Sequence, residues 1–108
     1  MAGKGDLRAE ERFPMGPDSA CVFASPVLED MEPIRVKNIS STGIGLISPM
    51  RLEPGLLMAI KLVNRAKNFS KTMLVRIVHV TPQPGNSYLI GGTLDTPLTY
   101  EELCLLVM

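Results

Sequence analysis

The sequence predicts an all-β fold, namely a six-stranded antiparallel β-barrel that ends in a short C-terminal α-helix. Two observations support this prediction. Short apolar runs alternate with turn-forming residues along most of the chain, and the last segment changes to helical spacing. A chain of 108 residues fits one domain. We expect a flexible N-terminal arm at residues 1–14 and the barrel with its helix at 15–108.

Six apolar runs are the candidate strands. The segments between them contain Gly, Pro, Asn, Asp and Ser, which favour turns, as in Ser41-Thr42-Gly43 and Glu53-Pro54-Gly55. Short strands at this spacing are typical of an antiparallel barrel. The predicted strands are residues 21–28, 33–38, 44–48, 56–64, 71–81 and 88–94.

The sequence predicts a helix that begins near Tyr100, with Thr99 as its N-cap. Thr99 and Glu102 have the spacing of a capping box, and Leu98 and Leu103 occupy the positions of a hydrophobic staple. A helix of barely two turns is unstable alone, so we expect it to lie on the barrel.

Composition argues against several classes of partner. Eleven basic residues balance eleven acidic ones, so we expect no binding to a nucleic acid polymer. No apolar run is long enough to span a membrane, and no secretory signal is recognisable, so we expect no membrane insertion and a cytoplasmic location. Cys21 and Cys104 cannot form a zinc site alone, and we expect both to be reduced packing residues, with no metal bound.

Two short motifs contain candidate binding residues. Arg8-Ala9-Glu10-Glu11-Arg12 places two guanidinium groups four residues apart, which by itself is typical of a solvated, charged segment. Asn38-Ile39-Ser40-Ser41-Thr42-Gly43 joins two predicted strands, which by itself is typical of a hairpin turn in which Gly43 has a positive φ.

Together the two motifs resemble the PilZ domain family, in which Arg-x-x-x-Arg is followed by [Asp/Asn]-x-Ser-x-x-Gly. Gly43-Ile44-Gly45-Leu46 and the run from Tyr88 to Leu94, followed by Pro97-Leu98, are similar to further parts of that family. Many members have Asp at the position of Asn38 and an aromatic residue at that of Leu94. The resemblance implies a split-barrel fold that binds the second messenger cyclic di-GMP through Arg8, Arg12, Asn38, Ser40 and Gly43.

These residue types suit a guanine dinucleotide. A guanidinium group can pair with guanine N7 and O6 or with phosphate oxygens, and it can stack on a base. The Asn38 oxygen can accept from the donor edge of guanine, Ser40 can add a hydroxyl contact, and Gly43 allows close approach of the backbone. We expect the arm to be mobile without ligand and to wrap over it when bound.

Three further residues are weaker candidates for ligand contact. Leu7 precedes the first arginine, a position that by resemblance influences whether one ligand or a stacked pair is held. The amides of the turn from Ser41 onward can face an oxygen of the ligand. His79 can pack on a guanine, and strict strand alternation puts it on the face opposite Arg76.

Other functional classes remain open. The sequence contains no arrangement typical of catalytic residues, so we expect no enzyme and no cofactor. A PilZ-fold adaptor that binds no nucleotide is the main alternative, and a small RNA-binding barrel is a weaker one, because the chain has few aromatic residues. A receptor without catalytic groups needs a protein partner, and we expect a monomer or a homodimer.

Overall fold

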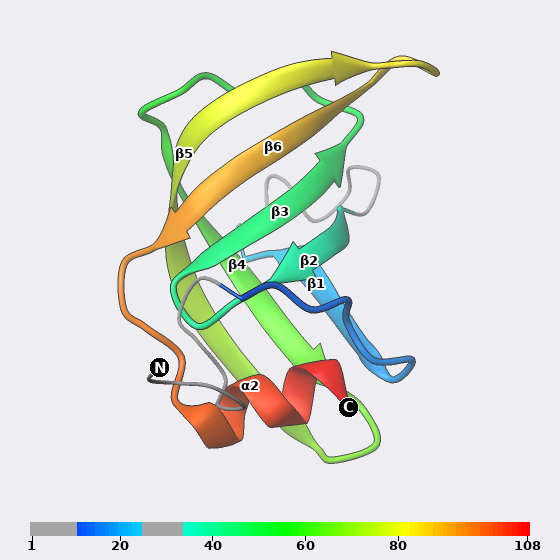
Figure 1. Ribbon diagram of the computed structural model, residues 1–108, viewed down its shortest axis with the longest axis vertical. Helices are drawn as coiled ribbons and strands as arrows, with labels where there is room; N and C mark the ends of the chain where they lie inside the picture. The colour runs from blue at the N-terminus through cyan, green and yellow to red at the C-terminus, as the bar shows by residue number, and fades with distance from the viewer. Residues whose placement is uncertain (1–10, 25–33) are drawn as a thin grey trace, which may run out of the picture.

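The computed structural model describes residues 11–24 and 34–108, and in them six strands form one antiparallel sheet that curls into a nearly closed barrel (Figure 1). The strand order is β1-β4-β5-β6-β3-β2, so β1 and β2 are the two outer strands, and they contact each other. The all-β barrel with one short C-terminal helix is therefore confirmed. The elements are β1 (Ser19–Phe23), β2 (Arg35–Ile39), β3 (Gly43–Ser48), β4 (Leu57–Asn64), β5 (Phe69–Gln83), β6 (Ser87–Leu94) and α2 (Tyr100–Val107).

The strand boundaries differ from the prediction mainly at β1 and β5. β1 begins at Ser19 rather than Cys21 and ends at Phe23, and the rest of the predicted first strand falls largely at residues 25–33, outside the described residues. β5 is four residues longer than predicted, because Phe69 and Ser70 still pair with β4 and residues 82 and 83 still pair with β6. Gly85 and Asn86 both have positive φ in the turn to β6, as a tight hairpin requires.

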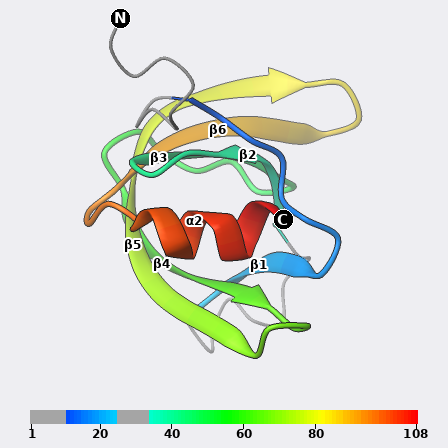
Figure 2. The ribbon, with the colours of Figure 1, turned by 60° about the horizontal axis from the view of Figure 1, so that its bottom comes forward.

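The core lies inside the barrel, and the long strands β4 and β5 contribute alternate residues to it. On β4 and β5, for example, Ile60, Leu62, Val75 and Ile77 are almost fully buried, whereas their neighbours face outward. Leu98, Leu103 and Leu106 belong to the same cluster and bring the helix onto it. Figure 2 shows α2 lying across the open end of the barrel, between β4 on one side and β2 and β3 on the other.

The start of α2 is held as the sequence predicts. The Thr99 hydroxyl accepts a hydrogen bond from the Glu102 amide at 3.1 Å, and the Thr99 amide donates to Glu102 Oε1 at 2.9 Å. This reciprocal capping box satisfies two amides that the first turn leaves without helical partners. Leu98 and Leu103 are both buried at the positions of the predicted staple. The predicted helix start is thus confirmed.

An ion pair between β5 and the helix predicts acid sensitivity. Lys71 Nζ lies 2.8 and 2.9 Å from the two oxygens of Glu102, and these hydrogen bonds lower the pKa of that carboxyl below its ordinary value of 4.5, helped by the Thr99 amide. A pKa that is lower in the folded state adds stability above pH 4.5, and this stability is lost as the pH falls through the folded value. Lys71→Met should therefore show a smaller loss of stability between neutral and acid pH than the wild type, measured as urea midpoints across that range.

Lys61→Met is the matched control for this prediction, because Lys61 is an exposed lysine on the neighbouring strand and forms no ion pair with another described residue. It should keep the acid sensitivity of the wild type. Equal acid sensitivity of the Lys71→Met variant and the wild type would contradict a contribution of the Lys71 pair to stability.

Within the described part of the chain, no helix has the length and apolar character needed to cross a membrane.

Candidate functional site

The two sequence motifs meet at the edge of the sheet. The Phe13 amide donates to the Ile39 carbonyl at 2.9 Å, and the Ile39 amide donates back to the Phe13 carbonyl at 2.8 Å. This bridge fastens the segment around Arg12 beside β2. Arg12 Nη1 then donates to Asn38 Oδ1 at 3.1 Å, across 26 residues of sequence. Arg12 and Asn38, predicted from separate motifs, therefore belong to one site.

Two glycines form the floor beside this pair. Asn38 on β2 pairs with Gly45 on β3, Gly45 pairs with Gly91 on β6, and Gly91 pairs with His79 on β5. A Cβ atom at Gly45 would lie 2.6 Å from Asn38 Oδ1, and one at Gly91 would lie 2.0 Å from His79 Cε1. The side chains of Asn38 and His79 therefore lie directly over Gly45 and Gly91, which have no side chains of their own. These four residues form one row across four neighbouring strands. The two glycines are the floor of the site, and the polar side chains of Asn38 and His79 are its walls.

A β-bulge aims each wall residue. The register of β2 shifts between Val36 and Asn38, and that of β5 shifts between Ile77 and His79, so Lys37 and Val78 are the extra residues. Bulges of this kind redirect the side chains that follow them. Val78 and His79 are consequently both exposed.

The expected position of His79 opposite Arg76 was wrong. Strict alternation assigns residues 76 and 79 to opposite faces, but the extra residue of the bulge adds one step. Arg76 and His79 therefore both lie on the outer, exposed side of the sheet.

Ser40 holds the turn between β2 and β3. Its hydroxyl oxygen accepts from the Gly43 amide at 3.0 Å and from the Thr42 amide at 3.3 Å, and the side chain is buried. The Ser40 amide donates to the Gly43 carbonyl at 2.9 Å, which closes the turn. In this conformation the Ser40 hydroxyl and two of the turn amides point into the turn itself. A direct contact from Ser40 to a ligand stays a prediction.

Gly43 is needed for space and not for a positive φ. The described glycines with positive φ are Gly55 and Gly85, so the expectation of a left-handed Gly43 was wrong. A Cβ atom at Gly43 would instead lie 2.9 Å from Arg12 Nη2 and 3.2 Å from the Gly92 carbonyl oxygen. The missing side chain lets the guanidinium group of Arg12 rest against the sheet.

Ser41 lies behind the turn, half-buried, and its carbonyl accepts from the Leu98 amide at 2.8 Å. This bond ties the turn to the segment that leads into α2. Leu7 and Arg8, the remaining predicted site residues, lie outside the described residues, so their proposed contacts stay predictions.

A cleft of about 190 Å³ opens over the glycine floor. It is smaller than the roughly 300 to 1,000 Å³ of pockets that enclose a whole small-molecule ligand. Among the described residues, no carboxylate belongs to its lining. The lining residues are Arg12, Lys37, Asn38, Gly45, His79, Leu89, Ile90 and Gly91.

The surrounding face of the sheet is basic. Strands β2, β3, β5 and β6 contain no Asp or Glu, whereas Arg35, Lys37 and Arg76 are exposed on them. With Arg12 above the floor, this face has a local excess of positive charge although the whole chain has none. An anionic ligand is therefore favoured here over a cationic one.

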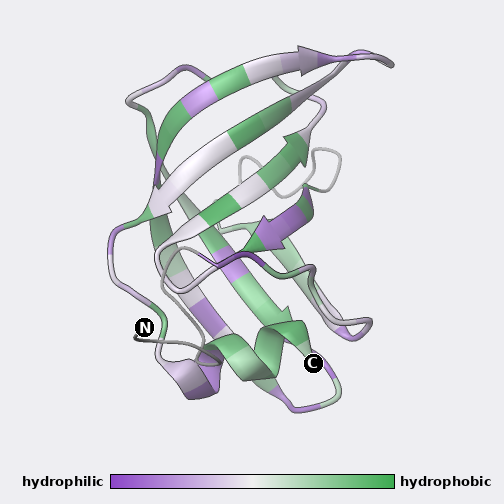
Figure 3. Ribbon diagram, in the orientation of Figure 1, coloured by the Kyte–Doolittle hydropathy of each residue, from purple (hydrophilic) through white to green (hydrophobic). Residues whose placement is uncertain are grey.

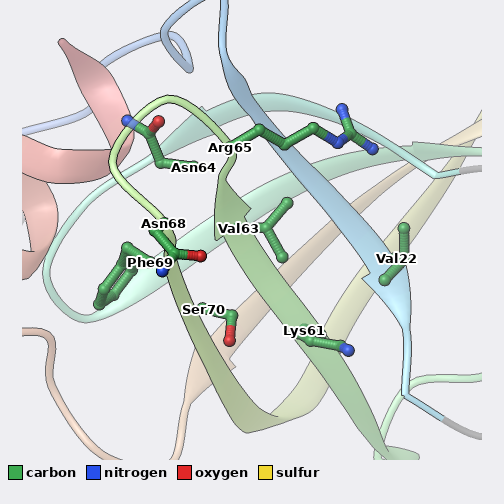
Figure 4. A pocket seen from close by; sticks show the side chains of 8 residues that line it. All are labelled: Val22, Lys61, Val63, Asn64, Arg65, Asn68, Phe69 and Ser70. Atoms are coloured by element: carbon green, nitrogen blue, oxygen red, sulfur yellow. The ribbon is translucent and has the colours of Figure 1, made fainter.

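A second hollow lies on the outer face of β1, β4 and β5, around Val22, Val63 and Ser70 (Figure 4). It also contains two cations, but in this view the amino group of Lys61 and the guanidinium group of Arg65 lie on either side of Val63. Cations that do not converge on one point cannot bind the same ligand group. The glycine cleft is the better candidate site.

Sequence reasoning missed the floor and the bulges. Gly45 and Gly91 were assigned to apolar strands, and no feature of the sequence alone showed that the two pair with each other. An isolated glycine within a strand signals close approach of another group, and that signal occurs in both strands. Among the described residues, no cluster of three or more His, Cys, Asp or Glu could hold a metal ion.

Comparison with protein-family models, with curated proteins and with solved structures finds no match to this chain, so the site is interpreted from its own residues.

Proposed function

We propose that the glycine cleft is a binding site for cyclic di-GMP and that the protein is a receptor or adaptor of PilZ type. One observation carries the proposal: Arg12 and Asn38, which come from two motifs that lie far apart in sequence, are hydrogen-bonded at 3.1 Å beside two glycines of β3 and β6. A hairpin turn and a solvated arginine that had no common ligand would not have to lie in contact. Their meeting favours one shared ligand.

The shape of the cleft suits a flat base. Because Gly45 and Gly91 have no side chains, Asn38 and the His79 imidazole lie close to the backbone of β3 and β6, and the imidazole offers a flat surface to a purine ring. The imidazole of His79 lies over Gly91 and lines the cleft, so a bound guanine can pack on it. The Asn38 oxygen retains a second lone pair for the donor edge of guanine. In this proposal the floor and its two walls hold one guanine.

The charge of the cleft suits the phosphodiester groups. Arg12 uses one of its five N–H donors on Asn38, so others remain for guanine N7 and O6 or for phosphate oxygens. Lys37 lines the same cleft, whereas no carboxylate of residues 11–24 or 34–108 does. Charge-assisted bonds of this type contribute about 1.5 to 3 kcal/mol each.

The small volume of the cleft leaves part of the ligand for the N-terminal arm to cover. A cleft of about 190 Å³ can hold part of a dinucleotide and leaves the rest uncovered. In our proposal Arg8 and Leu7, which precede the bridge at Phe13, cover the ligand from the arm side. A protein partner then reads the changed surface, because no described group is arranged for catalysis.

Arg12→Ala should weaken cyclic di-GMP binding by about ten- to a hundredfold, because it removes one or two charge-assisted contacts. Isothermal titration calorimetry of the full chain measures this, and we expect micromolar affinity for the wild type, equal to about −8 kcal/mol. Circular dichroism should show an unchanged fold, because Arg12 is exposed.

Arg65→Ala is the matched control. It removes the same charge from the turn after β4, away from the glycine cleft, and should bind like the wild type. Equal affinity of all three proteins would contradict the assignment of the cleft. Absence of any binding heat from the wild type would favour the adaptor that binds no nucleotide.

A further inference from the structure

We propose that the outward face of α2 is the interface for a second copy of this chain, with two α2 helices packed antiparallel across a two-fold axis near Cys104. This inference concerns the end of the barrel and does not depend on nucleotide binding. It rests on the apolar character of the helix, on a hollow beside it, and on the positions of two charges.

The helix is apolar on both sides beyond its first turn. Leu103 and Leu106 face the core and are almost fully buried. The outward side has Tyr100, Cys104 and Met108, spaced four residues apart, of which Tyr100 and Met108 are exposed. Figure 3 shows the resulting apolar colour of the helix after its start. An apolar outward side on this second turn is typical of a helix segment that is covered on that side as well.

A hollow of about 620 Å³ lies between this outward face and the turn that joins β4 to β5. Tyr100, Cys104, Leu105 and Met108 line it from the helix, and Lys67 lines it from the turn. Side chains from another chain can fill a space of this size, which would remove apolar surface from water.

The turn is fastened to the second half of the helix. The Asn64 amide Nδ2 donates to the Leu105 carbonyl at 2.5 Å, and the Lys67 amide donates to Asn64 Oδ1 at 3.1 Å. Lys67 therefore stands beside the C-terminal half of α2, whereas Glu101 is in its first turn. A positive and a negative charge thus border the hollow at opposite ends of the helix.

These charges favour a second copy over other partners. In an antiparallel pair, the first turn of each helix faces the last turn of the other, which places Glu101 opposite the partner's Lys67. The two-fold axis forms this contact twice, since such an interface is isologous. The antiparallel helix dipoles add to the attraction. Asp18 also lines the hollow near Lys67, so both charges have to be tested by exchange.

Cross-linking at the native cysteine tests the predicted axis. Cys104 is half-buried and lines the hollow, whereas Cys21 is 3% exposed and burial raises the pKa of its thiol to about 12, so Cys21 should not react. A short bis-maleimide should give a covalent dimer from the wild type and from Cys21→Ser. Cys104→Ser should give none, and a dimer from Cys104→Ser would overturn the proposed axis.

Charge exchange tests the antiparallel arrangement. Glu101→Lys or Lys67→Glu alone should weaken dimerisation by about tenfold, because each puts two like-charged pairs across the axis. The double variant should restore it. Sedimentation velocity over a dilution series measures the dissociation constant, and circular dichroism checks that the exposed substitutions leave the fold intact.

Two results would overturn the proposal. One is a wild-type chain that stays monomeric throughout the dilution series. The other is a dimer whose dissociation constant is the same in both single variants. If a small apolar molecule filled the hollow instead of a second copy, the chain would stay monomeric, which is the first of these results.

Discussion

Gly45→Val is expected to reduce cyclic di-GMP binding by a hundredfold or more, or about 3 kcal/mol, if the cleft has the proposed function. A Cβ atom at this position would lie 2.6 Å from Asn38 Oδ1, so Asn38 must move and its bond to Arg12 must change. The two methyl groups would also occupy the floor on which the base is proposed to lie. Gly45→Val thus disturbs Asn38, its hydrogen bond to Arg12, and the surface on which the base is proposed to lie.

The barrel itself should survive this change. Valine has a high preference for strands, and the outer side of Gly45 meets the movable ends of Asn38 and Arg12 instead of the core. We expect the free energy of unfolding to change by about 1 kcal/mol or less. Calorimetry measures binding, and urea denaturation measures stability.

Thr72→Val is the matched control for Gly45→Val. It adds a β-branched apolar residue to the outer face of β5, opposite Lys61 and away from the glycine cleft. Its affinity should equal that of the wild type. If Gly45→Val folded normally and still bound like the wild type, the floor would have no role in binding.

Leu106→Ala is expected to destabilise the protein by about 2 to 5 kcal/mol. Leu106 is fully buried and is one of the residues by which α2 contacts the core, so its removal leaves a cavity under the helix. An eight-residue helix has little stability of its own. Loss of this anchor should therefore loosen the whole helix, in addition to leaving the cavity.

Urea denaturation at one fixed protein concentration measures the effect of Leu106→Ala, because any self-association would make stability depend on concentration. Arg65→Ala, an exposed position in the turn after β4 and outside the hollow beside α2, should change the free energy of unfolding by about 0.5 kcal/mol or less. A loss below about 1 kcal/mol for Leu106→Ala would contradict its assignment as the anchor of α2.

The hydrophobic pattern by itself determined the class of fold. Alternating apolar residues bounded by turn formers identify strands because one face of each strand must be buried, and this local rule found six strands. The Thr99–Glu102 capping box located the helix for a similar reason, since a cap uses neighbouring residues only. Arg12, Asn38 and the Ser40 turn became candidates through the resemblance that their combined spacing shows, and their role in binding stays a prediction.

Tertiary structure alone decided how these residues combine. Strand order and register bring Gly45 beside Gly91, because pairing between distant strands depends on the whole barrel and no local rule specifies it. The bulges at Lys37 and Val78 aim Asn38 and His79 at that floor, and alternation cannot foresee an inserted residue. The sequence thus determined which elements form, whereas the register of the closed sheet decided that Arg12 and Asn38 share one cleft.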